Sequence, residues 1–106
     1  MSTINGTSDS ETLFGTDDTD RIITNGGNDT VYGGDGNDLI NTTATGYYLT
    51  NGTLIAYGEE GDDRIKGGSG GSNKLYGGEG DDTLYGNDGD DTLDGGEGDD
   101  TLQGND

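Results

Sequence analysis

A nine-residue repeat runs through most of the chain and constrains its fold more than any other feature. Its clearest copies share glycine at positions 1 and 4, aspartate at position 6 and an aliphatic residue at position 8. These copies are GGDGNDLIN (33–41), GGEGDDTLY (77–85), GNDGDDTLD (86–94) and GGEGDDTLQ (95–103). Less regular copies span 6–14, 15–23, 24–32, 58–66 and, with ten residues, 67–76. Because one such unit buries almost nothing alone, tandem copies predict a solenoid whose coils pack on their neighbours.

Two positions of the repeat carry most of the information. Positions 7 to 9 read polar, aliphatic, polar, as in Thr83-Leu84-Tyr85, which predicts a very short strand with its middle side chain pointing inward. Position 6 carries a carboxylate or, once, an amide. Its residues are Glu11, Asp20, Asp29, Asp38, Asp63, Asn73, Asp82, Asp91 and Asp100.

The middle of the chain, 42–57, has no acidic residue and breaks the pattern. Leu49 follows Ile40 by nine residues and Ala56 precedes Ile65 by nine. This register favours two degenerate repeats, 42–50 and 51–57. The alternative is an inserted hairpin that turns at Asn51-Gly52, a strong two-residue turn signal.

The composition indicates that the chain needs a ligand in order to fold. The chain has 106 residues, of which 24% are hydrophobic, and a formal net charge of -19. So little apolar surface cannot offset the conformational entropy, so we expect disorder unless a ligand supplies folding energy. The 23 acidic residues, against four basic ones, repel phosphate backbones and anionic membranes, which argues against nucleic acid and favours cations as partners.

The residue types also limit which cations the chain is expected to bind. With neither cysteine nor histidine, disulfides are excluded, and a zinc site made of oxygen alone would be atypical.

No stretch approaches the roughly 20 apolar residues of a membrane span. The start, MSTINGTSDS, lacks the basic and apolar regions of a secretory signal peptide. Export would therefore depend on another signal or on another part of a parent chain.

The glycines and aspartates together favour calcium. Glycine at positions 1, 2 and 4 allows tight turns with inward-pointing carbonyls, to which position 6 adds a carboxylate. Calcium takes about six to eight oxygen ligands at about 2.3–2.6 Å with tolerant geometry, whereas magnesium demands a near-ideal octahedron and keeps its waters. The acids at position 5, Asp62, Asp81, Asp90 and Asp99, would raise the local negative potential and are not assigned as ligands.

The pattern G-G-x-G-x-D-x-U-x, with U aliphatic, resembles the RTX (repeats-in-toxin, haemolysin-type) calcium-binding nonapeptide. The resemblance covers 6–103 and is clearest in 33–41, 77–85 and 95–103. It implies an all-β fold, a right-handed parallel β-roll (β-solenoid) with two facing short-stranded sheets and two repeats, about 18 residues, per coil. It also implies several Ca²⁺ ions between turns one coil apart, held by backbone carbonyls and by position-6 carboxylates of both turns.

The resemblance assigns ligands by position. The carboxylate ligands it implies are Asp20, Asp29, Asp38, Asp63, Asp82, Asp91 and Asp100, with Glu11 and Asn73 as weaker candidates. The backbone carbonyls it implies are those of Gly33, Gly36, Gly61, Gly77, Gly80, Gly86, Gly89, Gly95 and Gly98. The best pairs are Asp20 with Asp38, Asp63 with Asp82, and Asp82 with Asp100; Glu11 with Asp29 and Asn73 with Asp91 are weaker.

These assignments predict one β-roll with two calcium blocks. Residues 1–5 are a lead-in, 6–41 and 58–103 bind calcium, 42–57 form a calcium-free coil with Tyr47 and Leu54 in or near the position-6 slot, and 104–106 begin another repeat. One sheet would point inward Leu13, Val31, Leu49, Ile65, Leu84 and Leu102. The other would point inward Ile22, Ile40, Ala56, Leu75 and Leu93.

Simpler interpretations of the same residues fit less well. A flexible linker has no reason to keep an aliphatic residue every nine positions. Paired carboxylates can cleave glycosides, but these are periodic and not unique, so an enzyme is not expected. The flanks are too rich in glycine for the helices of an EF-hand. The aromatic residues at position 9 either cover a sheet or form a carbohydrate-binding stripe; they are Phe14, Tyr32, Tyr57, Tyr76 and Tyr85.

The sequence therefore predicts a calcium-binding module that is disordered at low calcium and folds outside the cell. The resemblance implies secretion in an unfolded state by type I machinery, with a secreted or cell-surface location. An alternative is a structural spacer or adhesin-type repeat; the irregular position 9 argues against ice binding. A third hypothesis is that the chain is a non-catalytic fragment of a secreted protease, lipase or toxin whose catalytic domain lies elsewhere. Uncapped coil ends would favour end-to-end self-association.

Overall fold

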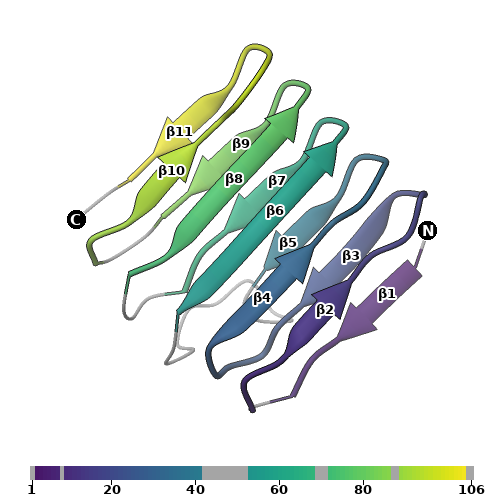
Figure 1. Ribbon diagram of the computed structural model, residues 1–106, viewed down its shortest axis with the longest axis vertical. Helices are drawn as coiled ribbons and strands as arrows, with labels where there is room; N and C mark the ends of the chain where they lie inside the picture. The colour runs from purple at the N-terminus through teal and green to yellow at the C-terminus, as the bar shows by residue number, and fades with distance from the viewer. Residues whose placement is uncertain (1, 8, 42–52, 69–71, 87–88, 105–106) are drawn as a thin grey trace.

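The chain winds into two parallel β-sheets that face each other (Figure 1). The computed structural model describes residues 2–7, 9–41, 53–68, 72–86 and 89–104. Within these ranges every regular element is a β-strand, and successive strands alternate between the two sheets. This arrangement confirms the predicted parallel β-roll.

The six-stranded sheet contains the odd-numbered strands and the five-stranded sheet the even-numbered ones, each in chain order and parallel throughout. The first sheet consists of β1 (Ser2–Asn5), β3 (Asp20–Ile23), β5 (Leu39–Asn41), β7 (Arg64–Lys66), β9 (Thr83–Tyr85) and β11 (Thr101–Gln103). The second consists of β2 (Thr12–Phe14), β4 (Asp29–Tyr32), β6 (Leu54–Glu60), β8 (Lys74–Glu79) and β10 (Thr92–Asp94). Most strands have three residues, because the other six residues of each nine-residue repeat form a turn.

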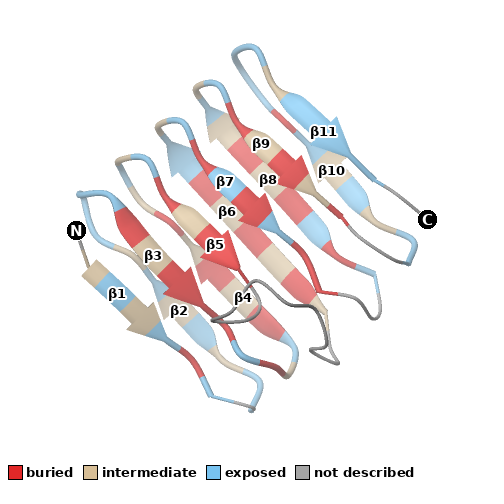
Figure 2. Ribbon diagram, turned by 180° about the vertical axis from the view of Figure 1, so that it is seen from behind, coloured by how far each residue is buried: buried red, intermediate tan, exposed pale blue. Residues whose placement is uncertain are grey.

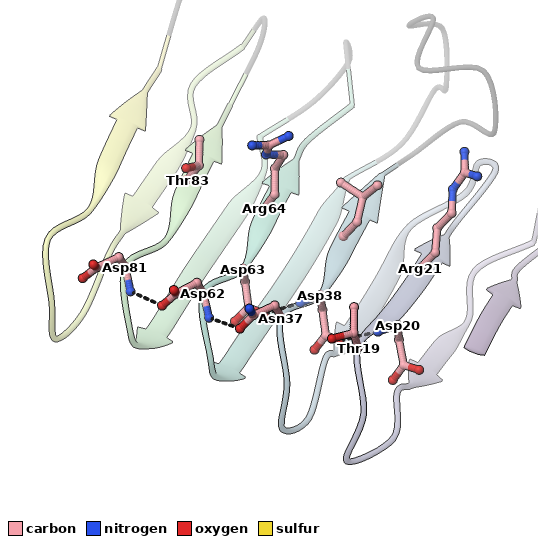
Figure 3. A pocket seen from close by; sticks show the side chains of 11 residues that line it. Thr19, Asp20, Arg21, Asn37, Asp38, Asp62, Asp63, Arg64, Asp81 and Thr83 are labelled. Atoms are coloured by element: carbon pink, nitrogen blue, oxygen red, sulfur yellow. Dashed lines mark hydrogen bonds between the residues drawn. The ribbon is translucent and has the colours of Figure 1, made fainter. Parts of the chain in front are cut away.

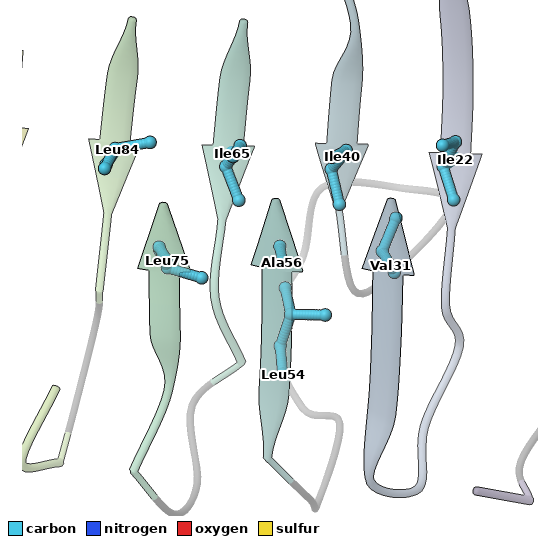
Figure 4. Packing of buried hydrophobic residues seen from close by; sticks show 8 residues of the cluster. All are labelled: Ile22, Val31, Ile40, Leu54, Ala56, Ile65, Leu75 and Leu84. Atoms are coloured by element: carbon cyan, nitrogen blue, oxygen red, sulfur yellow. The ribbon is translucent and has the colours of Figure 1, made fainter. Parts of the chain in front are cut away.

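The core is a single layer of aliphatic side chains between the sheets (Figure 4). Side chains alternate across a strand, so position 8 of each short strand points inward, and in the longer β6 Leu54 at position 6 does so as well. Burial of one such side chain contributes about 1.5–3 kcal/mol. The buried cluster consists of Ile22, Val31, Ile40, Leu54, Ala56, Ile65, Leu75 and Leu84, each at most 2% exposed. Figure 2 shows burial fading toward the ends, where β1 and β11 hold no buried residue.

The strand register corrects the sheet assignment expected beyond residue 41. Ile40 pairs with Ile65 and Val31 pairs with Ala56, so each of these coils spans 25 residues, whereas Ile22 pairs with Ile40 at a spacing of 18. Ile65, Leu84 and Leu102 therefore share a sheet with Ile22 and Ile40, and Leu75 and Leu93 share one with Leu13 and Val31. The predicted inward position of Leu49 lies outside the described residues.

The sequence assigned these strands to the wrong sheet because a nine-residue period does not show which repeats lie in neighbouring coils. Counting the seven additional residues between Ile40 and Ile65 as a shortened repeat moves every later strand to the opposite sheet. Pairing between strands depends instead on hydrogen bonds, and the N–H of Asp38 donates to Asp63 Oδ1 at 2.8 Å. The seven residues therefore lengthen one coil. The hairpin at Asn51-Gly52 also lies outside the described residues.

One turn residue has an unfavourable backbone conformation. Glu59 has φ 77°, while the residues that occupy its place in other coils, Gly34, Gly78 and Gly96, have φ 95°, 96° and 81°. Glu59 pairs directly with Gly78. A side chain in this left-handed region costs about 1–2 kcal/mol, which glycine avoids.

We therefore predict that Glu59→Gly stabilises the folded roll by about 1 kcal/mol, after subtraction of the larger entropy of glycine in the unfolded chain. The urea midpoint in saturating calcium measures this change. Glu60→Gly is the matched control, because it removes the same charge from the neighbouring position, where the backbone has no positive φ. Equal effects of the two substitutions would show that charge and not backbone strain is responsible.

Candidate metal centre

The turns from the five-stranded to the six-stranded sheet lie along one side of the roll, here called the first edge (Figure 1). Each turn starts at a position-1 glycine and ends at a position-6 aspartate. Because the coils stack in register, equivalent residues of successive turns lie side by side. The five turns are 15–20, 33–38, 58–63, 77–82 and 95–100.

The position-6 aspartates of the first edge form one continuous ladder. The N–H of each aspartate donates to Oδ1 of the aspartate one coil later, at 2.8 Å in every step. The ladder consists of Asp20, Asp38, Asp63, Asp82 and Asp100. On this edge the longer coil still stacks Asp38 directly on Asp63, so the two expected calcium blocks adjoin each other.

The second oxygen of these carboxylates faces a different environment. Oδ2 of Asp38, Asp63 and Asp82 is buried and has no hydrogen-bond partner. A side-chain carbon added to Gly33 would lie 2.6 Å from Asp38 Oδ2 and 2.7 Å from the carbonyl oxygen of Gly58, one coil later. Gly58 and Gly77 have the same surroundings, each facing the Oδ2 of its own turn and the carbonyl oxygen of the next glycine.

This arrangement fits a hard cation. A buried carboxylate oxygen without a partner is costly, and backbone carbonyls next to it add further negative partial charge. A calcium ion prefers several such oxygens with flexible geometry. No three acidic side chains of the described residues gather around one point. A site here would therefore combine carboxylates from two coils with the glycine carbonyls.

Burial and repulsion raise the pKa of the aspartates in the middle of the ladder. Burial, together with the charges of Asp38 and Asp82, raises the pKa of Asp63 to about 7. Burial and the charge of Asp20 raise the pKa of Asp38 to about 6. Burial and the charge of Asp100 also raise the pKa of Asp82. The metal-free ladder is thus electrostatically unfavourable at neutral pH.

Asp20, in the first of these turns, behaves differently. Burial alone would raise its pKa, but hydrogen bonds from the N–H and hydroxyl of Thr16 and from the N–H of Ser2 outweigh burial and lower it. Its carboxylate is therefore stabilised by protein donors, whereas Asp38, Asp63 and Asp82 have no donor at Oδ2.

The turns on the opposite side, the second edge, are less uniform. Their position-6 residues are Glu11, Asp29, Leu54, Asn73 and Asp91. Asp29 accepts the N–H of Glu11 at 2.9 Å, and burial followed by the charge of Glu11 raises its pKa despite that bond. Leu54 pairs with Asp29 and has no side-chain oxygen, as the sequence predicted for this slot. The ladder of acids is therefore interrupted on this edge alone.

Asn73 satisfies its turn without a metal. Its Nδ2 donates to the carbonyl oxygens of Gly68, at 3.0 Å, and Gly86, at 3.2 Å. These hydrogen bonds use the carbonyls that lie nearest the side chain. The amide thus replaces, with its own N–H groups, the positive charge that an aspartate in this slot would require. Oδ2 of Asp91, in the next coil, remains without a hydrogen-bond partner.

A second ladder, at position 5 of the first edge, was not expected from the sequence (Figure 3). The N–H of Asp62 donates to Asn37 Oδ1, that of Asp81 to Asp62 Oδ1 and that of Asp99 to Asp81 Oδ1, all at 2.8 Å. These side chains are exposed, and those of Asn37, Asp62 and Asp81 line a pocket together with position-7 residues such as Arg64. The signal was present in the sequence, because position 5 repeatedly carries a short side chain with a terminal oxygen.

The fold and the stacked turns define a class of protein, the repeat β-roll. The family described as RTX calcium-binding nonapeptide repeat (4 copies) matches residues 5–40, 55–70 and 67–102, and the chain belongs to this family. The unmatched residues 41–54 coincide with the lengthened coil. Comparison with curated proteins and with solved structures gave no match. In the described part of the chain, no helix is long and apolar enough to cross a membrane.

The raised pKa values predict how pH affects the metal-free roll. Asp38 and Asp63 bind more protons when folded than when unfolded, so their contribution to stability is fully present below about pH 4 and is lost as pH rises through about 6 and 7. In calcium-free buffer, the β-sheet signal in circular dichroism should increase as pH falls from about 7.5 to 4.5. A signal that is largest at neutral pH would contradict this prediction.

Proposed function

We propose that this chain is a calcium-controlled folding module, disordered where calcium is scarce and folded into the β-roll where calcium is abundant. RTX repeats are calcium-binding, non-catalytic modules, and this chain contains them. One observation carries the proposal: the buried Oδ2 atoms of Asp38, Asp63 and Asp82 have no partner and face glycine carbonyls.

The ions would lie between successive turns of the first edge. The ligands of the central space would be the carboxylates of Asp38 and Asp63 with carbonyls of the 33–38 and 58–63 turns. On the second edge, Asp29 and Asp91 remain candidate ligands, while Leu54 and Asn73 disfavour ions beside them. Bound calcium supplies positive charge that neutralises the stacked carboxylates, and in this way its binding energy becomes folding energy.

The setting in which this switch operates is outside the cell. Calcium affinities of extracellular modules are about 10⁻⁴–10⁻³ M, so such a chain stays unfolded in the cytosol and folds after export. A net charge of -19 and 24% hydrophobic residues support an unfolded state before calcium binds. We propose secretion by type I machinery as part of a longer bacterial protein, with the module in the medium or at the cell surface.

The first test is a calcium titration followed by far-ultraviolet circular dichroism. We expect a transition from coil to β-structure with a midpoint of about 10⁻⁴–10⁻³ M calcium, and no transition with magnesium at the same concentrations. A chain that is already rich in β-structure in chelator would instead be a calcium-independent spacer. That result would overturn the proposed switch.

A second test separates ligands from bystanders by neutralising one acid at a time. Asp63→Asn should raise the calcium midpoint about tenfold, or about 1.4 kcal/mol, because the amide removes a ligand charge and donates to the neighbouring carbonyls as Asn73 does. Asp62→Asn is the matched control, because its exposed side chain still accepts the N–H of Asp81. It should change the midpoint less than about twofold. Equal shifts would mean that overall charge, and not ligation, sets the affinity.

A further inference from the structure

Four aromatic rings stack in a column, one each from β2, β4, β6 and β8. These four strands are neighbours in the five-stranded sheet (Figure 1). The rings of Phe14 and Tyr32 have centroids 5.3 Å apart, and those of Tyr32–Tyr57 and Tyr57–Tyr76 are 5.1 Å apart. Each pair is inclined by only 9°. The column follows from strict register, because the four residues are Cα partners of one another.

The column belongs to the surface and not to the core. Its neighbours in sequence, Leu13, Val31, Ala56 and Leu75, point inward, so alternation places the rings outside. The three tyrosines are partly exposed, and Phe14 is 66% exposed. Four large rings at a spacing of about 5 Å thus present a continuous aromatic strip to solvent, where most proteins keep exposed apolar area small.

A column of carboxylates lies three residues after Tyr32, Tyr57 and Tyr76 and continues in the next coil, after Asp94. Asp35, Glu60, Glu79 and Glu97 are register partners in successive coils, and all four are exposed. Between the two columns lie Gly34 and Gly78, where an added side-chain carbon would collide with the backbone oxygen of Thr16 or Glu59. In the central coil the same place holds Glu59, which pairs with Gly78 and adds a further exposed carboxylate.

The rings do not suit a carbohydrate. Sugars stack on exposed ring faces, but an inclination of 9° turns the faces of this column toward one another and leaves mainly ring edges exposed. Tyr85, grouped with these residues from the sequence, is on β9 in the other sheet, and Lys66 Nζ lies 5.6 Å from its ring centroid. The five aromatic residues therefore do not form one stripe.

We propose that this outer face binds rigid, planar, positively charged aromatic molecules. Such a ligand lies along the ring column, where its flat face covers the ring edges, and its charge is attracted to the adjacent carboxylates. Three ring-to-ring steps accommodate a rod-shaped molecule of a few linked rings. The site requires the folded roll, because only strand pairing brings the four rings together.

Thioflavin T, a planar cationic dye, tests the proposal by fluorescence titration of the folded protein. Circular dichroism first establishes the folded state, so a failure to fold with calcium is detected separately from a failure to bind dye. Tyr57→Leu removes a central ring and should weaken binding about tenfold, or about 1.4 kcal/mol. Tyr85→Leu makes the same change at the same repeat position in the other sheet, and should alter binding less than about twofold.

The acidic column has its own test. The double variant Glu60→Gln and Glu79→Gln should weaken dye binding about tenfold, whereas Asp62→Asn with Asp81→Asn, an equal loss of charge two residues further along the same two turns, should change it less than about threefold. Three results would each overturn the proposal: no dye binding by the folded protein, equal effects of Tyr57→Leu and Tyr85→Leu, or displacement of the dye by a neutral cello-oligosaccharide.

Discussion

The stacking of buried carboxylates along the first edge is the interaction on which the rest of the structure depends. Each position-6 aspartate uses Oδ1 to accept the N–H of the preceding coil, which fixes the register of both sheets. The same stacking leaves Oδ2 of Asp63 buried and raises its pKa to about 7. The hydrogen bonds to Oδ1 thus align the coils, whereas repulsion between the stacked carboxylates destabilises the roll. Added positive charge relieves this repulsion.

Several local features follow from this constraint. Position 1 must be glycine on the first edge, because a side chain on Gly33 would occupy the space between Asp38 Oδ2 and the Gly58 carbonyl. Where the carboxylate is missing, the chain avoids the conflict: Leu54 joins the hydrophobic cluster, and Asn73 supplies its own N–H donors. Among the described residues, the second edge therefore has fewer buried carboxylate oxygens without a partner than the first edge, although the same repeat builds both edges.

Side chains on the outer faces of the two sheets take no part in the stacking of carboxylates, so their residue types can vary from repeat to repeat. Most residues at position 9 touch solvent, whereas Ile23 and Asn41 are buried, and those of alternate repeats fall on opposite sheets. This separation collects Phe14, Tyr32, Tyr57 and Tyr76 into one stacked column and places Lys66 and Tyr85 on the other face. Calcium at the edges would hold the roll together, while the proposed aromatic strip uses the regular spacing that the edges impose.

The sequence alone determined the class of fold and the role of each repeat position, because the period of nine encodes turn, strand and inward side chain within a few residues. Ile22, Ile40 and Leu84 are buried as predicted, and Leu54 occupies the slot without a carboxylate. Only the tertiary structure decided which coils are neighbours: the pairing of Ile40 with Ile65 absorbs seven extra residues that a sequence period cannot distinguish from another repeat. It also decided that Asp38 and Asp63 stack and that four rings form a column, because contacts between coils depend on strand register and not on distance along the chain.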